Sequence, residues 1–228
     1  LTTPGYARFR ESPAHDSQYD PLSDDARRLI LALIDDVIDA TRPEAYFHLG
    51  GDETWNLGQS DKCRPIVAEI GTGGLYLRHM LPIIRHVVAR GLRPVLWADI
   101  ALSHPEIISQ FPREVVWMDW DYWTTGARDA RLHVWEAARR FTWPELADAD
   151  VPGFTRDLAE YAVDAQTRHD GTFRGFPYTA ALRGMGFDVI TAPATRSWGD
   201  AMGIPRNSVH LPNGCFAART GRTVGLGA

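Results

Sequence analysis

Two adjacent carboxylates, Asp52 and Glu53, follow an apolar segment and the glycine pair Gly50-Gly51. A strand that ends on two glycines can turn sharply, because no Cβ restricts the backbone there. Neighbouring side chains of a strand point to opposite faces, but the glycine break allows both acids to face one pocket. Two close carboxylates repel each other, which favours keeping a proton on one of them. A proton donor beside an anion is the division of labour that glycoside hydrolysis requires.

The same pair also has a purely structural interpretation. An Asp and a Glu after a strand are typical of a helix that begins with a capping residue and an acid in its first turn. A metal site of His48, Asp52 and Glu53 is a weaker interpretation, because no second His or Cys cluster supports it, and we expect neither metal nor cofactor. His48 has the strand parity of Asp52. It either supports the acids through a hydrogen bond or is an ordinary interior histidine.

The run HLGGDETWNLG, residues 48–58, resembles the signature of family 20 glycoside hydrolases, the β-N-acetylhexosaminidases. Its Leu57-Gly58 step is similar to the hexosaminidase D branch of that family. Two later segments resemble family strands that end in a pocket Trp, namely RPVLWADI (93–100) and VVWMDWDYW (115–123). The resemblance covers most of residues 1 to about 125. It implies a (β/α)8 TIM barrel, of which the chain holds a part, from the end of strand three to the start of strand eight.

The resemblance also implies a reaction. Family members act as exo-enzymes on terminal N-acetylglucosamine or N-acetylgalactosamine, with retention and with the substrate's own 2-acetamido oxygen as nucleophile. Glu53 would be the general acid that protonates the leaving oxygen and then the base that activates water. Asp52 would orient the acetamido group and stabilise the positive charge of the intermediate. The expected partners are glycans or glycosides that contain N-acetylhexosamine.

Other side chains are expected to surround the sugar from the ends of predicted strands. By the resemblance, Trp97 and Trp120 line the pocket around the sugar face and the acetamido methyl group, and the alternative is that each is a core aromatic. Asp99 and Asp121 follow those strand ends. They accept hydrogen bonds from sugar hydroxyls or are solvated loop acids. Trp55 either forms a wall of the pocket or packs under the loop.

The chain departs from the family pattern in two places. Gly5-Tyr6 stands where relatives often have Gly-His, so a His that supports Asp52 is missing. The segment 190–200 has no Tyr to hold the acetamido oxygen, which leaves Arg196 or Trp198 to shape the site. The family's pocket Trp from strand eight is expected beyond residue 228.

These departures leave two other functions open. One is a different retaining barrel glycosidase, in which Glu53 is the acid and a separate carboxylate is the nucleophile. The candidates for that nucleophile are Asp99, Asp119 and Asp121. The other is a catalytically inactive carbohydrate-binding module, which keeps the aromatic residues but lacks a complete site. Fold alone separates none of these, because barrels support many chemistries.

Length and composition restrict the class of protein. With 228 residues and 44% hydrophobic content, one partial catalytic barrel domain over residues 1–228 is expected. The net charge of −5 disfavours nucleic acid and anionic membranes as partners, and no apolar run reaches the ~18–20 residues that span a bilayer. Residues 1–20 contain no apolar signal segment, which slightly favours the cytoplasm. Cys63 and Cys215 are expected as reduced thiols, with one long-range bridge as the alternative. The sequence does not define the oligomeric state.

Hydrophobic periodicity and turn signals predict the elements that position these residues. A helix is predicted at 22–41 with Ser23 as N-cap, and another at 73–90 that ends at Gly91. Further helices are predicted near 105–110, 127–141, 156–168 and 178–184. Strands are predicted at 45–49, 94–97, 114–118, 188–192 and 223–227. Strands that alternate with helices in this way indicate βα units and a parallel sheet, and an incomplete barrel exposes strand edges.

Overall fold

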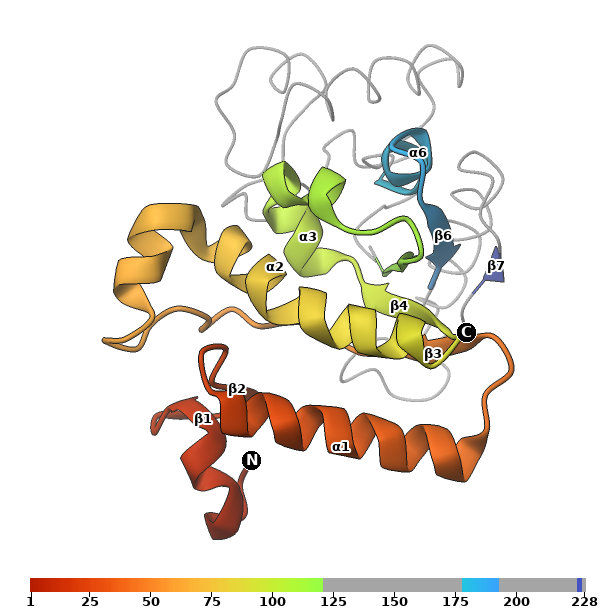
Figure 1. The fold of residues 1–228 in the computed structure, drawn as a ribbon. Helices are drawn as coiled ribbons and strands as arrows, with labels where there is room; N and C mark the ends of the chain where they lie inside the picture. Colours follow the sequence, from red (N-terminus) through yellow and green to blue (C-terminus); the bar gives the residue numbers. More distant parts are fainter. Residues whose placement is uncertain (121–177, 193–224, 227–228) are drawn as a thin grey trace, which may run out of the picture. The chain divides into compact units, whose positions relative to one another are not determined.

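The computed structural model describes residues 1–120, 178–192 and 225–226 (Figure 1). The chain divides into two compact units. The first contains residues 1–96 and 106–115, and the second contains residues 97–105 and those from 116 onward. The predicted helices at 127–141 and 156–168 lie outside the described residues. So do four residues that the sequence singled out, namely Asp121, Arg196, Trp198 and Cys215.

The first unit begins with elements that the sequence did not predict. A 3-10 helix, η1 (Pro4–Phe9), leads into an antiparallel hairpin of β1 (Arg10–Ser12) and β2 (His15–Tyr19). The buried positions of this hairpin are polar and include Glu11 and Gln18. A strand whose buried side chains are polar has no apolar alternation, which is why the sequence pattern missed it.

Helix α1 (Asp24–Thr41) confirms a predicted helix and its cap, although it begins two residues later than expected. The hydroxyl of Ser23 accepts a hydrogen bond from the N–H of Ala26 at 3.1 Å. This bond satisfies one of the donors that a helix leaves unpaired at its start. On the inner face of α1, Ile34 and Ile38 are buried.

Helix α2 (Arg64–Ala89) is longer than the predicted helix, which covered only 73–90. Gly71 has non-helical dihedral angles, with φ of +73°, and divides α2 into two parts. The apolar periodicity marked the second part, while the shorter first part was missed. Gly91, just beyond the helix, has φ of +78°, in agreement with its predicted role as the terminating glycine.

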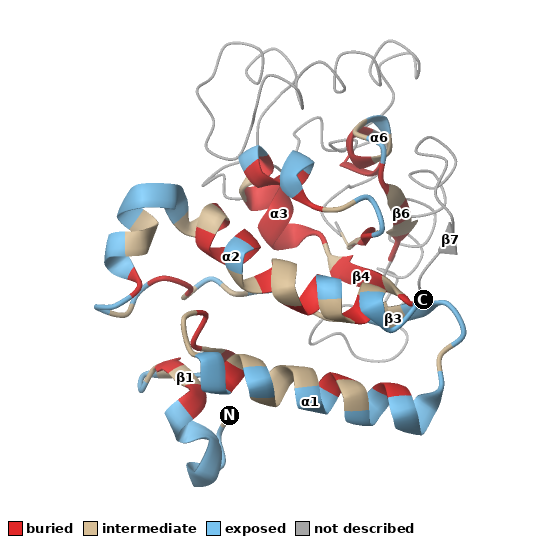
Figure 2. Cartoon of the chain, viewed as in Figure 1, coloured by how far each residue is buried: buried red, intermediate tan, exposed pale blue. Residues whose placement is uncertain are grey.

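Strands β3 (Tyr46–His48) and β4 (Arg93–Trp97) run parallel, with His48 opposite Val95. The N–H of Leu49 extends this pairing through a 2.8 Å hydrogen bond to the carbonyl of Val95. The predicted helix at 105–110 is the 3-10 helix η2 (Pro105–Gln110). Figure 2 shows that β4 and the second half of α2 carry many of the buried residues, whereas α1 is exposed or half-buried along most of its length.

The second unit also consists of helices and parallel strands. It includes α3 (Asp99–Ser103), β5 (Val116–Asp119), α6 (Tyr178–Gly184), β6 (Asp188–Thr191) and β7 (Gly225–Leu226). β6 pairs in parallel with β5 and with β7. α3 was not predicted, while α6 has the predicted bounds. The α/β class with parallel strands is confirmed. In the described parts of the chain, no helix is both long enough and apolar enough to cross a membrane.

Candidate active site

The acid pair follows β3 on an unusual stretch of backbone. Gly50, Gly51 and Glu53 have φ of +72°, +87° and +51°. The left-handed region costs a residue with a side chain roughly 1–2 kcal/mol, so Glu53 keeps an unfavourable conformation that its surroundings must maintain. The next helix, α2, begins only at Arg64, so the interpretation of the pair as a helix cap is wrong. Backbone strain of this kind concentrates at functional sites.

His48 supports the glycine turn that precedes the acids. Its Nδ1 accepts a hydrogen bond from the N–H of Gly50 at 2.9 Å, which leaves the proton of the neutral ring on Nε2. Burial lowers the pKa of His48, and the nearby negative charge of Asp52 opposes that shift. His48 and Asp52 therefore interact electrostatically, and the histidine favours its neutral form.

A cavity of about 430 Å³ lies between α1, α2 and β3, and both His48 and Asp52 line it. Much of its wall is aliphatic, from residues of α1 and α2: Ile30, Leu33, Ile34, Val37, Met80 and Ile83. Neither Glu53 nor Trp55 lines it. The cavity also touches Phe47 and His48 of β3 and Leu49 directly after it. It is not the Trp-walled sugar pocket that the sequence predicted.

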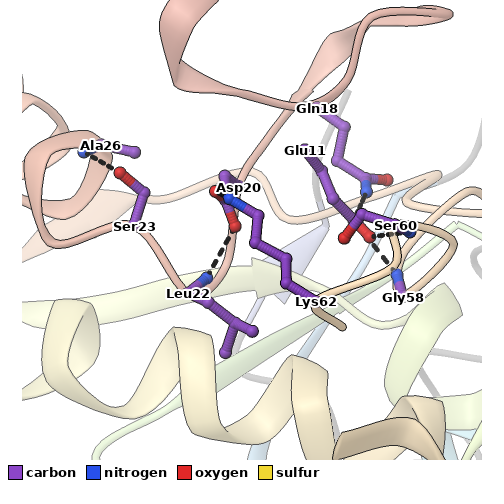
Figure 3. A network of polar contacts seen from close by, with 9 residues as sticks. All are labelled: Glu11, Gln18, Asp20, Leu22, Ser23, Ala26, Gly58, Ser60 and Lys62. Carbon is purple, nitrogen blue, oxygen red and sulfur yellow. Dashed lines mark hydrogen bonds and ion pairs between the residues drawn. The ribbon is translucent and has the colours of Figure 1, made fainter. Parts of the chain in front are cut away.

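Two polar anchors hold the segment that carries the acids. Before the pair, the hydroxyl of Tyr76 donates a 2.9 Å hydrogen bond to the carbonyl of Gly51. After the pair, the N–H groups of Gly58 and Ser60 donate to the carboxylate of Glu11 at 3.1 and 3.0 Å (Figure 3). Sequence reasoning identified neither Glu11 nor Tyr76, because the partners in these bonds lie 25 to 49 positions apart.

Trp55 lies on the loop between these anchors and is 47% exposed. The buried residue of the loop is Leu57, at 7%. Leu57, and not Trp55, is therefore the residue that packs under the loop. The role of Trp55 as a wall of the sugar site stays a prediction.

In the second unit, Asp99 and Trp120 contact each other directly. The indole N–H of Trp120 donates a 3.2 Å hydrogen bond to Oδ1 of Asp99, which lies in the first turn of α3. Asp99 is fully buried, so the interpretation of this residue as a solvated loop acid is wrong. Trp97 and Trp120 are half-buried, whereas Trp117 is fully buried in the core of this unit.

Asp119, considered above as an alternative nucleophile, ends β5 and is 8% exposed. Its Oδ2 accepts a hydrogen bond from the hydroxyl of Thr179, on α6, at 2.7 Å. The first unit thus holds His48, Asp52, Glu53 and Trp55, and the second holds Trp97, Asp99 and Trp120. Within the described residues, no group of three or more His, Cys, Asp or Glu side chains is arranged to hold a metal ion.

Comparison with known proteins gives one family. The model of the glycosyl hydrolase family 20 catalytic domain matches residues 7–137. Hexosaminidase D of Homo sapiens is 27% identical over 148 residues, which cover 62% of this chain and 30% of the human protein. Hexosaminidase D of Bos taurus is 30% identical over 134 residues, which cover 56% of this chain and 38% of the bovine protein. The chain therefore spans only 30% to 38% of the length of these relatives.

Two solved structures are similar at low sequence identity. Dispersin B has a TM-score of 0.45 and 16% identity, and the match covers 94% of this chain and 47% of dispersin B. The β-N-acetylhexosaminidase from Bacteroides fragilis NCTC 9343 has a TM-score of 0.42 and 18% identity. That match covers 82% of this chain and 29% of the bacterial one.

Proposed function

Because this chain belongs to glycosyl hydrolase family 20, we propose that it forms part of the catalytic barrel of an exo-acting β-N-acetylhexosaminidase. The observation that carries the proposal is the family match over residues 7–137, which includes the whole segment with the acid pair. The relatives from human and cattle are both named Hexosaminidase D, which supports N-acetylhexosamine as the substrate class. The substrates would be glycans or glycosides that end in N-acetylglucosamine or N-acetylgalactosamine.

In this proposal the two carboxylates have separate tasks. Glu53 donates a proton to the glycosidic oxygen as the bond to the leaving group breaks, and later removes a proton from the attacking water. Asp52 orients the 2-acetamido group, whose oxygen attacks the anomeric carbon, and stabilises the positive charge that develops. Both side chains are exposed, and Glu53 keeps a left-handed backbone, as expected of groups that are fixed for contact with a ligand.

In the second unit, Trp97 and Trp120 are the side chains that we propose for sugar binding. Asp99 is buried and accepts a hydrogen bond from the indole N–H of Trp120, and this bond fixes the orientation of that ring. Trp120 and Trp97 would then present flat faces to the sugar and the acetamido methyl group. A sugar-binding role for Asp121 remains part of the same proposal.

We infer that β3 is paired on its second side in the complete protein. Within the described strands, β3 stands at one end of the order and pairs only with β4. The aliphatic cavity lies beside β3, and a strand at the end of a sheet presents backbone groups with which a further strand can pair. A further barrel strand would fill this space, in keeping with the partial coverage of the relatives.

The test is hydrolysis of 4-nitrophenyl N-acetyl-β-glucosaminide and of the corresponding galactosaminide by the full-length protein. Glu53→Gln and Asp52→Asn should each lower kcat at least ~100-fold, since Glu53 is also the base that activates water and Asp52 stabilises the charge of the intermediate. Glu69→Gln is the matched control, because it makes the same change at an exposed carboxylate on α2. This variant should keep the parent activity.

Three other outcomes would contradict the proposal in different ways. A folded full-length protein that hydrolyses neither substrate would favour the sugar-binding module. Activity that survives Glu53→Gln would mean that another residue is the acid. An active enzyme that resists a thiazoline inhibitor, which mimics the cyclic intermediate, would favour a carboxylate nucleophile instead of the acetamido oxygen.

A further inference from the structure

Glu11, on β1, is a buried carboxylate surrounded by hydrogen-bond donors, and it lies outside the segment that carries the acids. It is 6% exposed. Oε2 accepts hydrogen bonds from the side-chain amide of Gln18 at 2.6 Å and from the N–H of Gly58 at 3.1 Å. Oε1 accepts a hydrogen bond from the N–H of Ser60 at 3.0 Å. Figure 3 shows this carboxylate between the hairpin and the loop that follows the acid pair.

These bonds fix the loop backbone at Gly58 and Ser60. Hydrogen bonds to an ionised carboxylate are roughly twice as strong as those between neutral groups. Gly58 has φ of +87°, and a Cβ at this position would lie 2.5 Å from Cγ2 of Val67, on α2. The backbone at Gly58 is therefore held between the Glu11 carboxylate on one side and α2 on the other.

The acid pair lies between this anchor and the one at Gly51. Tyr76 bonds to the carbonyl of Gly51, directly before Asp52. Between the two anchors, the N–H of Leu57 donates a hydrogen bond to the carbonyl of Thr54 at 3.0 Å and closes a turn. The left-handed conformation of Glu53 is unfavourable for a free loop and persists only where the surrounding structure determines it.

We propose that Glu11 is a positioning residue for the acid pair, and that its carboxylate keeps Glu53 in the conformation from which it donates its proton. The inference rests on the proposed function of Glu53. Glu11 acts only through the loop backbone, via Gly58 and Ser60. General acid catalysis depends on the distance and angle between the acid and the leaving oxygen, so a loosened loop lowers the rate of proton transfer.

The test replaces Glu11 with Gln in the full-length protein. The substitution keeps the shape of the side chain but turns one acceptor oxygen into an NH₂ group, which cannot accept a backbone N–H. One of the two loop bonds is therefore lost. Hydrogen exchange of the peptide that contains Gly58 and Ser60 should accelerate at least ~10-fold, because these amides are then less protected.

The catalytic readout compares two substrates that differ in the leaving group. Methyl N-acetyl-β-glucosaminide needs a proton on its leaving oxygen, whereas 4-nitrophenolate leaves readily without one. In Glu11→Gln, kcat/KM should fall at least ~10-fold more on the methyl glycoside than on the nitrophenyl glycoside. A purely structural role would lower the active fraction and reduce both values by the same factor, so the ratio reports on positioning alone.

Lys62→Met is the matched control. It removes the ion pair of Lys62 with the buried Asp20, which belongs to the same polar region but makes none of the loop bonds to Glu11 (Figure 3). This variant should lose stability while the ratio between the two substrates stays at the parent value. Equal losses on both substrates in Glu11→Gln, or unchanged exchange of the loop amides, would overturn the positioning role. A folded parent that is inactive on both substrates would overturn the proposed function, and the positioning role with it.

Discussion

The hydroxyl of Tyr76 donates a hydrogen bond to the carbonyl of Gly51, and a Cβ on Gly51 would lie only 2.7 Å from that hydroxyl oxygen. The two residues thus fit each other in two ways: the glycine leaves room for the phenol, and the phenol fixes the peptide that leads to Asp52. The ring of Tyr76 is almost fully buried, at 2% exposed. Its hydroxyl is therefore held at the turn by the packing of α2.

Tyr76→Phe should destabilise the protein by about 1 kcal/mol, because it removes one partly buried hydrogen bond and leaves the Gly51 carbonyl without that donor. Urea denaturation of parent and variant measures the change. Tyr46→Phe is the control, since it removes the same hydroxyl group at a side chain of β3 that is 47% exposed. The control should change stability by less than about 0.5 kcal/mol. Equal effects of the two substitutions would show that the Tyr76 hydroxyl contributes nothing specific.

Gly51→Ala should destabilise the protein more than Gly91→Ala does. Both glycines have a positive φ, so both variants lose roughly 1–2 kcal/mol from backbone strain. Only at Gly51 does the new methyl group also meet Tyr76 and Leu96, which adds roughly 1–3 kcal/mol. At Gly91 no atom lies within 4 Å of the added Cβ.

A double substitution isolates the contact between Gly51 and Tyr76. Because Tyr76→Phe removes the oxygen that an alanine at position 51 would meet, the double variant should lose less stability than the sum of the single variants. Strict additivity in urea denaturation would contradict the steric relationship.

Regular periodicity made much of the fold predictable. α1 and the second part of α2 have an apolar face at helical spacing. Ser23 marks the start of α1, and Gly91 marks the end of α2. The hairpin of β1 and β2, by contrast, has polar residues at its buried positions. Glu11 and Gln18 look like surface residues until the loop that Glu11 binds is in place. Such a pattern gives no hydrophobic signal, and only the tertiary structure shows that these side chains are buried.

The candidate site was predictable only where its residues are adjacent in the sequence. Asp52 and Glu53 were identified because the glycines and the acids are adjacent in sequence, and their roles stay predictions that the variants above test. Asp99 was predicted either to bind sugar hydroxyls or to be a solvated loop acid. Its burial and its hydrogen bond from Trp120 rule out the solvated acid. That contact joins residues 21 positions apart. Single-sequence patterns describe neighbours along the chain, and contacts of this length depend on packing.

Cys63 should react slowly with thiol reagents in the folded protein. It is fully buried and free, as the sequence predicted, and burial raises the pKa of its thiol to about 11. Alkylation requires the thiolate, which is scarce at pH 8 for such a group. In a Cys215→Ser background, iodoacetamide should modify Cys63 at least ~100-fold more slowly in buffer than in 8 M urea. Rapid modification of the folded protein would mean that the thiol is accessible.

His79, on α2, should make the protein less stable in acid. Burial is the main cause that lowers its pKa from the ordinary value of 6.5, and the positive charge of Arg27 adds to this, while Asp20 and a hydrogen bond with the backbone of Pro21 oppose it. The unfolded chain therefore binds a proton at a higher pH than the folded chain does. The contribution of His79 to stability is complete above about pH 6.5 and declines as the pH falls from there toward the lowered pKa.

His79→Leu should flatten this dependence. Urea denaturation at pH 7.5 and pH 5.5 should show a larger loss of unfolding free energy on acidification in the parent than in the variant, whatever the variant loses at pH 7.5. An unchanged slope in His79→Leu would mean that its imidazole takes up protons equally in the folded and unfolded chains, and that the packing of α2 does not exclude its charged form.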